Sequence, residues 1–182
     1  MSFNVADPVG ATGIQADLAS FAAMGCHGLS VITAIAVGDT ARIEDAQTID
    51  ADWVSDQARV ILEDMAVRAF KVGYLGGVEN VSVIAEIVSD YPDIPLVLDP
   101  FSSRMPDLGA DGDDDLLLAL RELLVPQTTL LLLSAVELGR LAETWREPAN
   151  RDTLSEDVMH LIDLVTMRVQ AQEPSNLADG LH

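Results

Sequence analysis

The amino-acid sequence predicts an α/β protein of three layers, in which a mostly parallel sheet carries helices on both faces. Two observations lead to this fold class. Short apolar blocks alternate with amphipathic segments of helical length, which is typical of right-handed βαβ units with parallel strands. The chain of 182 residues, 49% of them apolar, also suits a single domain with a sizeable core.

Apolar spacing predicts the elements of the first half of the chain. The apolar run Leu29–Val37 is rich in β-branched residues, which predicts a strand buried on both faces. The segment Ala51–Met65 repeats apolar residues at helical spacing, and Trp53 belongs to its expected inner stripe. In chain order, the expected elements are a strand stub at Phe3–Ala6, a helix at Ile14–Met24, a strand at Leu29–Val37, a helix at Ala51–Met65 and a strand at Ala69–Val72.

The second half continues this alternation and then loses it. The segment Asp107–Asp115 has five Asp and two Gly in nine residues, which predicts a solvated loop that supplies an acidic residue to the next helix N-terminus. The expected elements are a helix at Glu79–Tyr91, a strand at Leu96–Asp99, a helix at Asp113–Leu124, a strand at Thr128–Leu133 and helices at Val136–Trp145 and Ser155–Val165. We therefore predict one domain over residues 1–166 and an irregular tail over residues 167–182.

The charge and cysteine content exclude several classes of partner. The 10 basic and 30 acidic residues give a formal net charge of −20, which would repel nucleic acid and anionic membrane surfaces. A phosphate ligand would need Mg²⁺ or a helix N-terminus beside it. No apolar stretch approaches the ~20 residues of a membrane span, and the N-terminus lacks a signal-peptide pattern. Because Cys26 is the only cysteine, we expect a reducing, cytoplasmic location.

Four loops leave the carboxyl ends of predicted strands, where ligands bind in open α/β sheets. The first loop, Asp7–Asp17, has Gly10 and Gly13 at a strand-to-helix turn, so its backbone could approach a ligand closely. It matches neither a GxGxxG nor a Walker pattern, and a plain turn with helix caps explains it equally well. The second loop begins at Gly38.

Three charged residues at the other loops each have two interpretations. Lys71 lies inside an apolar strand, where a charge needs either a ligand or a carboxylate partner in a structural ion pair. Its candidate partners are Asp7, Asp17 and Asp99. Asp99 ends a buried strand, where it either holds Mg²⁺ through water or caps the following loop. Glu137 opens a helix as a second magnesium-associated carboxylate or as a favourable first-turn acid.

Four motifs follow one another along these loops. They are Asp-Pro-x-Gly-x-x-Gly-Ile-Gln-Ala-Asp-Leu at 7–18, Ser-Val-Ile-Thr-Ala at 30–34, Lys-Val-Gly-x-Leu-Gly at 71–76 and Val-Leu-Asp-Pro at 97–100. This series resembles hydroxymethylpyrimidine/phosphomethylpyrimidine kinase, a thiamine-pathway family of the ribokinase-like superfamily. The resemblance runs from Asp7 to Ala142, and its first motif is the most specific.

The resemblance implies a ribokinase-like fold that lacks the C-terminal part, and a kinase that uses ATP and Mg²⁺. Its substrates would be 4-amino-5-hydroxymethyl-2-methylpyrimidine and then the monophosphate of that compound. Positioning and charge neutralisation carry such reactions. The residues that the resemblance implies for substrate binding are Asp7, Gly10, Thr12, Gly13, Asp17, Gly38, Tyr74 and Phe101. Those that it implies for magnesium are Asp99 and Glu137. It also implies a homodimer, with a small pyrimidine as partner.

The sequence departs from the family at several pocket positions. At Gly38 the family typically has a Gln that reads the pyrimidine edge. The positions of Tyr74 and Phe101 are often Met and Val, and Ser134 replaces the Asn of an Asn-x-x-Glu motif. These changes predict a different or poorer ligand fit. The family's Gly-x-Gly-Cys segment, which supplies the anion hole and the proposed base, has no counterpart here, so the resemblance assigns no catalytic residue.

Three functional hypotheses therefore stand at this point. The first is a kinase of this family with impaired turnover. The second is a non-catalytic relative that binds a small heterocycle or a partner protein. The third is a truncated gene product, whose exposed sheet edge would invite dimerisation.

Overall fold

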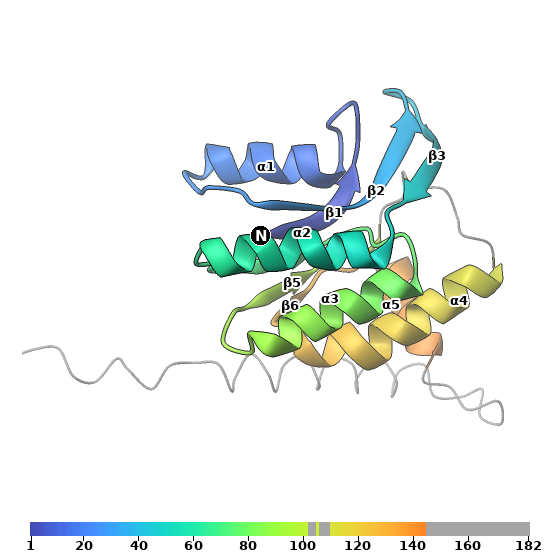
Figure 1. Cartoon of the computed structure of the whole chain (residues 1–182). Helices are drawn as coiled ribbons and strands as arrows, with labels where there is room; N and C mark the ends of the chain where they lie inside the picture. Colours follow the sequence, from blue (N-terminus) through green and yellow to red (C-terminus); the bar gives the residue numbers. More distant parts are fainter. Residues whose placement is uncertain (102–104, 106–109, 145–182) are drawn as a thin grey trace, which may run out of the picture.

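The computed structural model describes residues 1–101, 105 and 110–144. Within these ranges the chain forms six strands and five α-helices (Figure 1). The strands are β1 (Ser2–Ala6), β2 (Ser30–Gly38), β3 (Ile43–Thr48), β4 (Phe70–Val72), β5 (Leu96–Leu98) and β6 (Leu130–Leu131). The α-helices are α1 (Gly13–Ala23), α2 (Ala51–Asp64), α3 (Val78–Asp90), α4 (Ala110–Ala119) and α5 (Ala135–Glu143). The expected helix Ser155–Val165 and the expected tail 167–182 lie outside the described residues.

The strands form a single sheet in the order β3-β2-β1-β4-β5-β6. Every neighbouring pair is parallel except β2 and β3, which are antiparallel. From β1 the chain moves outward to β2 on one side and later returns to β4 on the other side. This arrangement confirms the predicted fold class and places a topological switch point beside β1.

The side chains of β1 alternate between two different faces of the sheet. Phe3 joins Val54 of α2 and Ile84 of α3 in the main core cluster. Ser2 and Asn4 instead bind a side chain of α1. Figure 1 shows α1 on one side of β1 and β2, with α2 and α3 on the other. The sheet therefore has an apolar face under α2 and α3 and a polar strip under α1.

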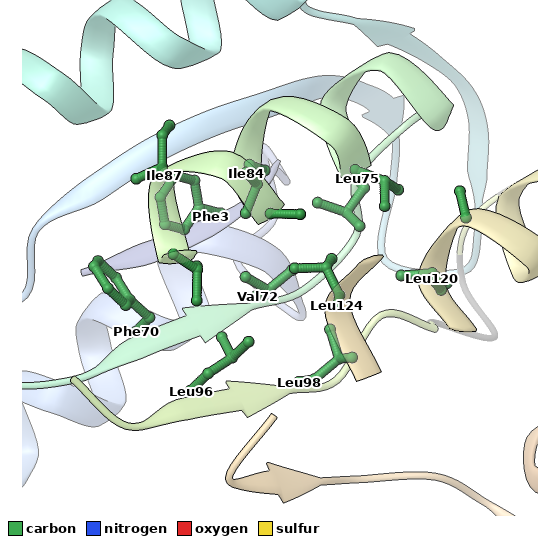
Figure 2. Packing of buried hydrophobic residues seen from close by; sticks show 14 of the residues in the cluster. Phe3, Phe70, Val72, Leu75, Ile84, Ile87, Leu96, Leu98, Leu120 and Leu124 are labelled. Atoms are coloured by element: carbon green, nitrogen blue, oxygen red, sulfur yellow. The ribbon is translucent and has the colours of Figure 1, made fainter. Parts of the chain in front are cut away.

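The main core lies between the apolar face of the sheet and the helices above it (Figure 2). Its largest fully buried side chains include Phe3, Phe70, Leu75, Ile84, Ile87, Leu96, Leu98, Leu120 and Leu124. Burial of each such side chain contributes about 1.5–3 kcal/mol relative to exposure. This packing anchors β1, β4 and β5, whose carboxyl ends carry the candidate site.

β3 is a strand that the sequence pattern did not predict. Only Ile43 is buried within its charged sequence IEDAQT, so no apolar run marks it. The turn before it is local, because the carboxylate of Asp39 accepts hydrogen bonds from the backbone N–H groups of Ala41 and Arg42. Asp39 is the local signal for this turn, because Asp side chains commonly bind backbone N–H groups two or three residues further on.

Two predictions of burial are wrong. At the end of β2, Ile35 and Val37 are exposed, because β3 is an edge strand and leaves one face of this hairpin open. On α2 the buried residues are Val54 and Ala58, whereas Trp53 is 69% exposed. Trp53 lies one position away from the stripe that faces α3.

The helix expected at Asp113–Leu124 begins earlier, at Ala110, so the end of the predicted acidic loop lies inside α4. After Ala119 the backbone widens into a π-helical turn over Leu120–Leu124 and then tightens into a 3₁₀ turn over Val125–Gln127. Among the described residues, no helix has the length and apolar content needed to cross a membrane.

Candidate functional site

The candidate site lies at the carboxyl edge of the sheet, where β1, β4 and β5 end next to one another. Three loops leave this edge, over residues 7–12, 73–77 and from 99 onward. The chain turns away in opposite directions from β1, and ligands of open α/β sheets bind in the crevice at such a switch point.

The loop after β1 is organised by Asp7, which is 1% exposed. Its carboxylate accepts hydrogen bonds from the backbone N–H groups of Val9, Ala11 and Thr12, at 3.0, 2.9 and 3.0 Å. The carboxylate therefore shapes the loop from inside. Thr12 is the N-cap residue of α1 and makes no side-chain capping bond there.

Two glycines allow this loop and α1 to lie close to β1. Gly10 and Gly13 have φ values of +73° and +67°, which favour glycine. A Cβ on Gly13 would lie 2.2 Å from the carbonyl oxygen of Val5. Only glycine therefore permits this approach, which brings the N-terminus of α1 to the edge of the sheet.

Four side chains hold the backbone of the loop after β4. The Oδ1 atom of Asn4 accepts a hydrogen bond from the Tyr74 N–H at 3.0 Å. The remaining three bonds run from Thr33 Oγ1 to the Tyr74 carbonyl, from Asn80 Nδ2 to the Leu75 carbonyl and from Thr48 Oγ1 to the Gly76 carbonyl. Sequence reasoning missed all four side chains, which come from four different elements.

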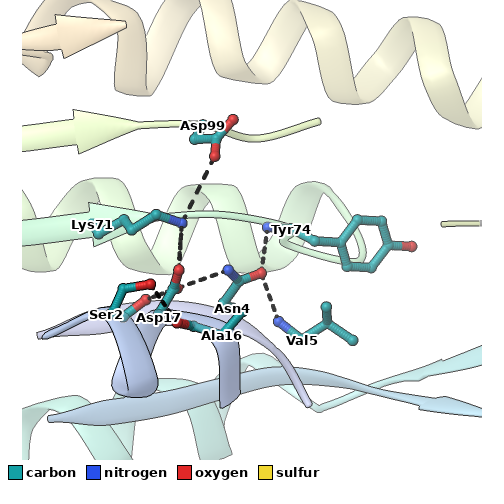
Figure 3. A network of polar contacts seen from close by, with 9 residues as sticks. Ser2, Asn4, Val5, Ala16, Asp17, Lys71, Tyr74 and Asp99 are labelled. Carbon is teal, nitrogen blue, oxygen red and sulfur yellow. Dashed lines mark hydrogen bonds and ion pairs between the residues drawn. The ribbon is translucent and has the colours of Figure 1, made fainter. Parts of the chain in front are cut away.

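A cluster of charges lies on the polar strip under α1 (Figure 3). The Nζ atom of Lys71 lies 3.1 Å from the nearer carboxylate oxygen of Asp17 and 3.8 Å from that of Asp99. Asp17 also accepts hydrogen bonds from Ser2 Oγ at 2.6 Å and from Asn4 Nδ2 at 2.9 Å. Two of the candidate partners of Lys71 are therefore in place, whereas Asp7 binds the amides of its own loop.

The pKa of Asp99 is raised above its ordinary value. Burial is the largest cause, and the neighbouring carboxylates of Asp17 and Glu137 raise it further, while the ammonium group of Lys71 lowers it. Ionisation of Asp99 is therefore less favourable than in the unfolded chain, and the effect of Glu137 on this pKa places Glu137 within electrostatic range of Asp99.

Glu137 lies at the start of α5 and forms a capping box with Ser134. Its Oε2 atom accepts a hydrogen bond from the Ser134 N–H at 2.7 Å, while the Ser134 hydroxyl accepts one from the Glu137 N–H at 3.3 Å. The first-turn interpretation thus describes its contacts. A place near Mg²⁺ is compatible with these contacts of Glu137, because Mg²⁺ keeps most of its waters and needs only one or two carboxylates from the protein. No group of three or more metal-ligating side chains occurs among the residues that the structure describes.

The other residues predicted for the pocket lie at or after the carboxyl ends of β2, β4 and β5. Tyr74 is 8% exposed and belongs to a small apolar cluster with Val5, Ala34, Ala36, Ile43 and Met105. Phe101 is half-buried and packs against the main core. Gly38 has no room for a side chain, because a Cβ would lie 2.5 Å from the Arg42 carbonyl oxygen and 2.7 Å from Ile43 Cα.

The sheet order, the switch point and the loops at its edge define an α/β protein of the ribokinase-like fold. The family model described as phosphomethylpyrimidine kinase matches residues 7–171. The chain therefore belongs to the phosphomethylpyrimidine kinase family.

Relatives of known sequence and structure agree with this assignment. The hydroxymethylpyrimidine/phosphomethylpyrimidine kinase of Streptomyces coelicolor is 34% identical over 137 residues, which cover 75% of this chain and 48% of that protein. The crystal structure of phosphomethylpyrimidine kinase from Clostridium difficile 630 has 25% identity and a TM-score of 0.72, covering 90% of this chain and 72% of that one. An ADP complex of Bacillus subtilis pyridoxal kinase has 25% identity and a TM-score of 0.73, covering 90% and 61%. The chain spans about half the length of the curated relatives it matches.

Proposed function

We propose that this chain provides the substrate side of a kinase site. The kinase transfers the terminal phosphoryl group of ATP to 4-amino-5-hydroxymethyl-2-methylpyrimidine and then to its monophosphate, in thiamine biosynthesis. Membership of the family supports the reaction class. The observation that carries the proposal is that a glycine-shaped loop, Tyr74 and Asp99 follow the carboxyl ends of the neighbouring strands β1, β4 and β5 at one edge of the sheet.

In this proposal the residues have separate roles. The loop that Asp7 shapes and the N-terminus of α1 lie against the pyrimidine, and the ring of Tyr74 forms a wall. Asp99 and Glu137 hold Mg²⁺ through water. Mg²⁺, when bound, neutralises charge on the transferred phosphoryl group. A chain with net charge −20 has particular need of such a cation. A cytoplasmic homodimer belongs to the same proposal.

A coupled ADP-release assay tests the proposed reaction. The full chain is incubated with MgATP, with and without the hydroxymethylpyrimidine. We expect ADP release that depends on both the pyrimidine and Mg²⁺, and that falls in Asp99→Asn. The matched control is Asp93→Asn, an exposed aspartate in the turn before β5. ADP release no greater than the background without pyrimidine would overturn the kinase assignment for this chain.

A second candidate function is ligand binding without turnover. It is favoured by Glu137, whose carboxylate is engaged in the capping box of α5. Calorimetry with the hydroxymethylpyrimidine separates the candidates, because this function predicts saturable binding with background ADP release. Gly38 has no side chain that could bind the pyrimidine edge. Under either function we therefore expect the dissociation constant for the hydroxymethylpyrimidine to be above the micromolar range. A micromolar dissociation constant would contradict this altered fit.

A further inference from the structure

Asn4 lies in the middle of β1, and its side-chain amide binds three different parts of the fold. It is 5% exposed and lies between α1 and β4. Its Nδ2 atom donates to Asp17 of α1 at 2.9 Å, and its Oδ1 atom accepts from the N–H groups of Val5 and Tyr74, at 2.9 and 3.0 Å. One buried amide thus joins the first helix, the central strand and the loop after β4 (Figure 3).

The first residue after β4 makes room for this amide. A Cβ on Gly73 would lie 2.3 Å from Asn4 Nδ2 and 2.5 Å from Asn4 Oδ1. The absence of a side chain at Gly73 therefore allows Asn4 to reach under the loop. There both backbone polar groups of Tyr74 are bound, because its N–H donates to Asn4 Oδ1 and its carbonyl accepts from Thr33 Oγ1.

We infer that Asn4 is a positioning residue for the ligand site: its amide sets the place of the Tyr74 backbone, and therefore of the Tyr74 ring. The inference rests on the proposed function, because it takes Tyr74 to be a wall of the pyrimidine pocket. Asn4 itself lies beneath the loop and acts through Tyr74. It also couples this wall to α1 through Asp17.

Ser2 separates positioning from a general contribution to stability. Its hydroxyl donates to the same carboxylate oxygen of Asp17 that Asn4 binds, at 2.6 Å. Ser2 is fully buried and lies on the same face of β1, two residues away. None of its described hydrogen bonds reaches the loop after β4. Loss of either side chain weakens the Asp17 cluster, whereas only the loss of Asn4 releases Tyr74.

The experiment compares Asn4→Leu, which keeps the branched shape but removes the amide, with Ser2→Ala. Amide hydrogen exchange at Tyr74 is followed by NMR in each full-length protein without ligand, and the affinity for the hydroxymethylpyrimidine is measured by calorimetry. We expect Asn4→Leu to speed Tyr74 exchange by about tenfold or more and to weaken pyrimidine binding by about tenfold, because a buried N–H loses its acceptor. We expect Ser2→Ala to leave both readouts near wild type.

The outcomes distinguish the inference from the function on which it rests. Unchanged Tyr74 exchange in Asn4→Leu, or changes of equal size in Ser2→Ala, would overturn the inference. So would faster exchange with unchanged pyrimidine affinity. If the wild type binds no pyrimidine, the proposed function fails and the exchange comparison still decides whether Asn4 positions Tyr74. Should Asn4→Leu fail to fold, Asn4→Ala, which leaves space for water, replaces it in both measurements.

Discussion

At the scale of single residues, the polar strip under α1 depends on Lys71. Its side chain is 20% exposed and that of Asp17 is 12% exposed, so both charges are largely removed from water. Separation of such a pair leaves an uncompensated charge, which costs far more than the loss of an exposed pair. These contacts give Lys71 a structural role at the base of the candidate site.

The substitution Lys71→Met tests this role. We expect the free energy of unfolding to fall by about 2–3 kcal/mol in urea denaturation, because Asp17 and Asp99 lose their cation. The control is Arg42→Met, whose ion pair with Glu44 is mostly exposed, and whose effect should stay within about 0.5 kcal/mol. If Lys71→Met proves as mild as the control, the ion pair is not structural and Lys71 is free to contact a ligand.

The raised pKa of Asp99 predicts a pH dependence of stability. In the folded protein this carboxyl group keeps its proton at pH values where the unfolded chain has lost it. The contribution of Asp99 to stability therefore decreases as the pH rises from its ordinary pKa through the raised one. Urea denaturation of wild type and Asp99→Asn between about pH 3.5 and about pH 7 measures this contribution as a difference. If the wild type instead gained stability relative to Asp99→Asn as the pH rises, the raised pKa of Asp99 would be contradicted.

At the scale of elements, the loop after β4 is held by side chains from its neighbours. Asn80 also joins this loop to other segments, because its Nδ2 atom donates to the carbonyl oxygens of Thr33, Ile49 and Leu75, at 3.3, 3.2 and 2.8 Å. These carbonyls belong to β2, to the segment before α2 and to the loop itself. The Oδ1 atom of Asn80 is buried without a hydrogen-bond partner among the described residues. One amide thus ties three parts of the fold to α3.

This arrangement makes the charge at position 80 more important than the size of the side chain. We expect Asn80→Asp, which keeps the shape, to reduce the free energy of unfolding at neutral pH by about 3 kcal/mol or more, because a carboxylate would face three carbonyl oxygens. The effect should exceed that of Asn80→Ala in the same denaturation experiment. A larger loss in Asn80→Ala would mean that packing, and not the three hydrogen bonds, explains the burial of Asn80.

The elements also show why sequence reasoning succeeded in some places and failed in others. Apolar runs located β2, β4 and β5, and closely spaced glycines located the loop after β1, because these signals are local. β3 was not predicted, because only Ile43 of this edge strand is buried and no apolar run marks it. Asp17 was among the predicted partners of Lys71, but the sequence could not choose between the candidates, because Lys71 lies 54 residues from Asp17 and only the packing of α1 against β1 and β4 brings them together. The part that Asn4 plays in this cluster was not predicted.

At the scale of the whole molecule, the sheet places the three loops of the candidate site at one edge while the chain carries a net charge of −20. The charge predicts that a phosphate-bearing ligand binds there only with a cation, since the repulsion must be neutralised locally.

The central claim is that the carboxyl edge beside β1 binds the hydroxymethylpyrimidine. Titration calorimetry of this compound into the full chain, in the presence of Mg²⁺, tests it most directly. The account predicts saturable one-to-one binding, weaker than micromolar, which Asn4→Leu reduces and Ser2→Ala leaves unchanged. Absence of saturable heat with a wild-type protein that is folded by circular dichroism would contradict the claim.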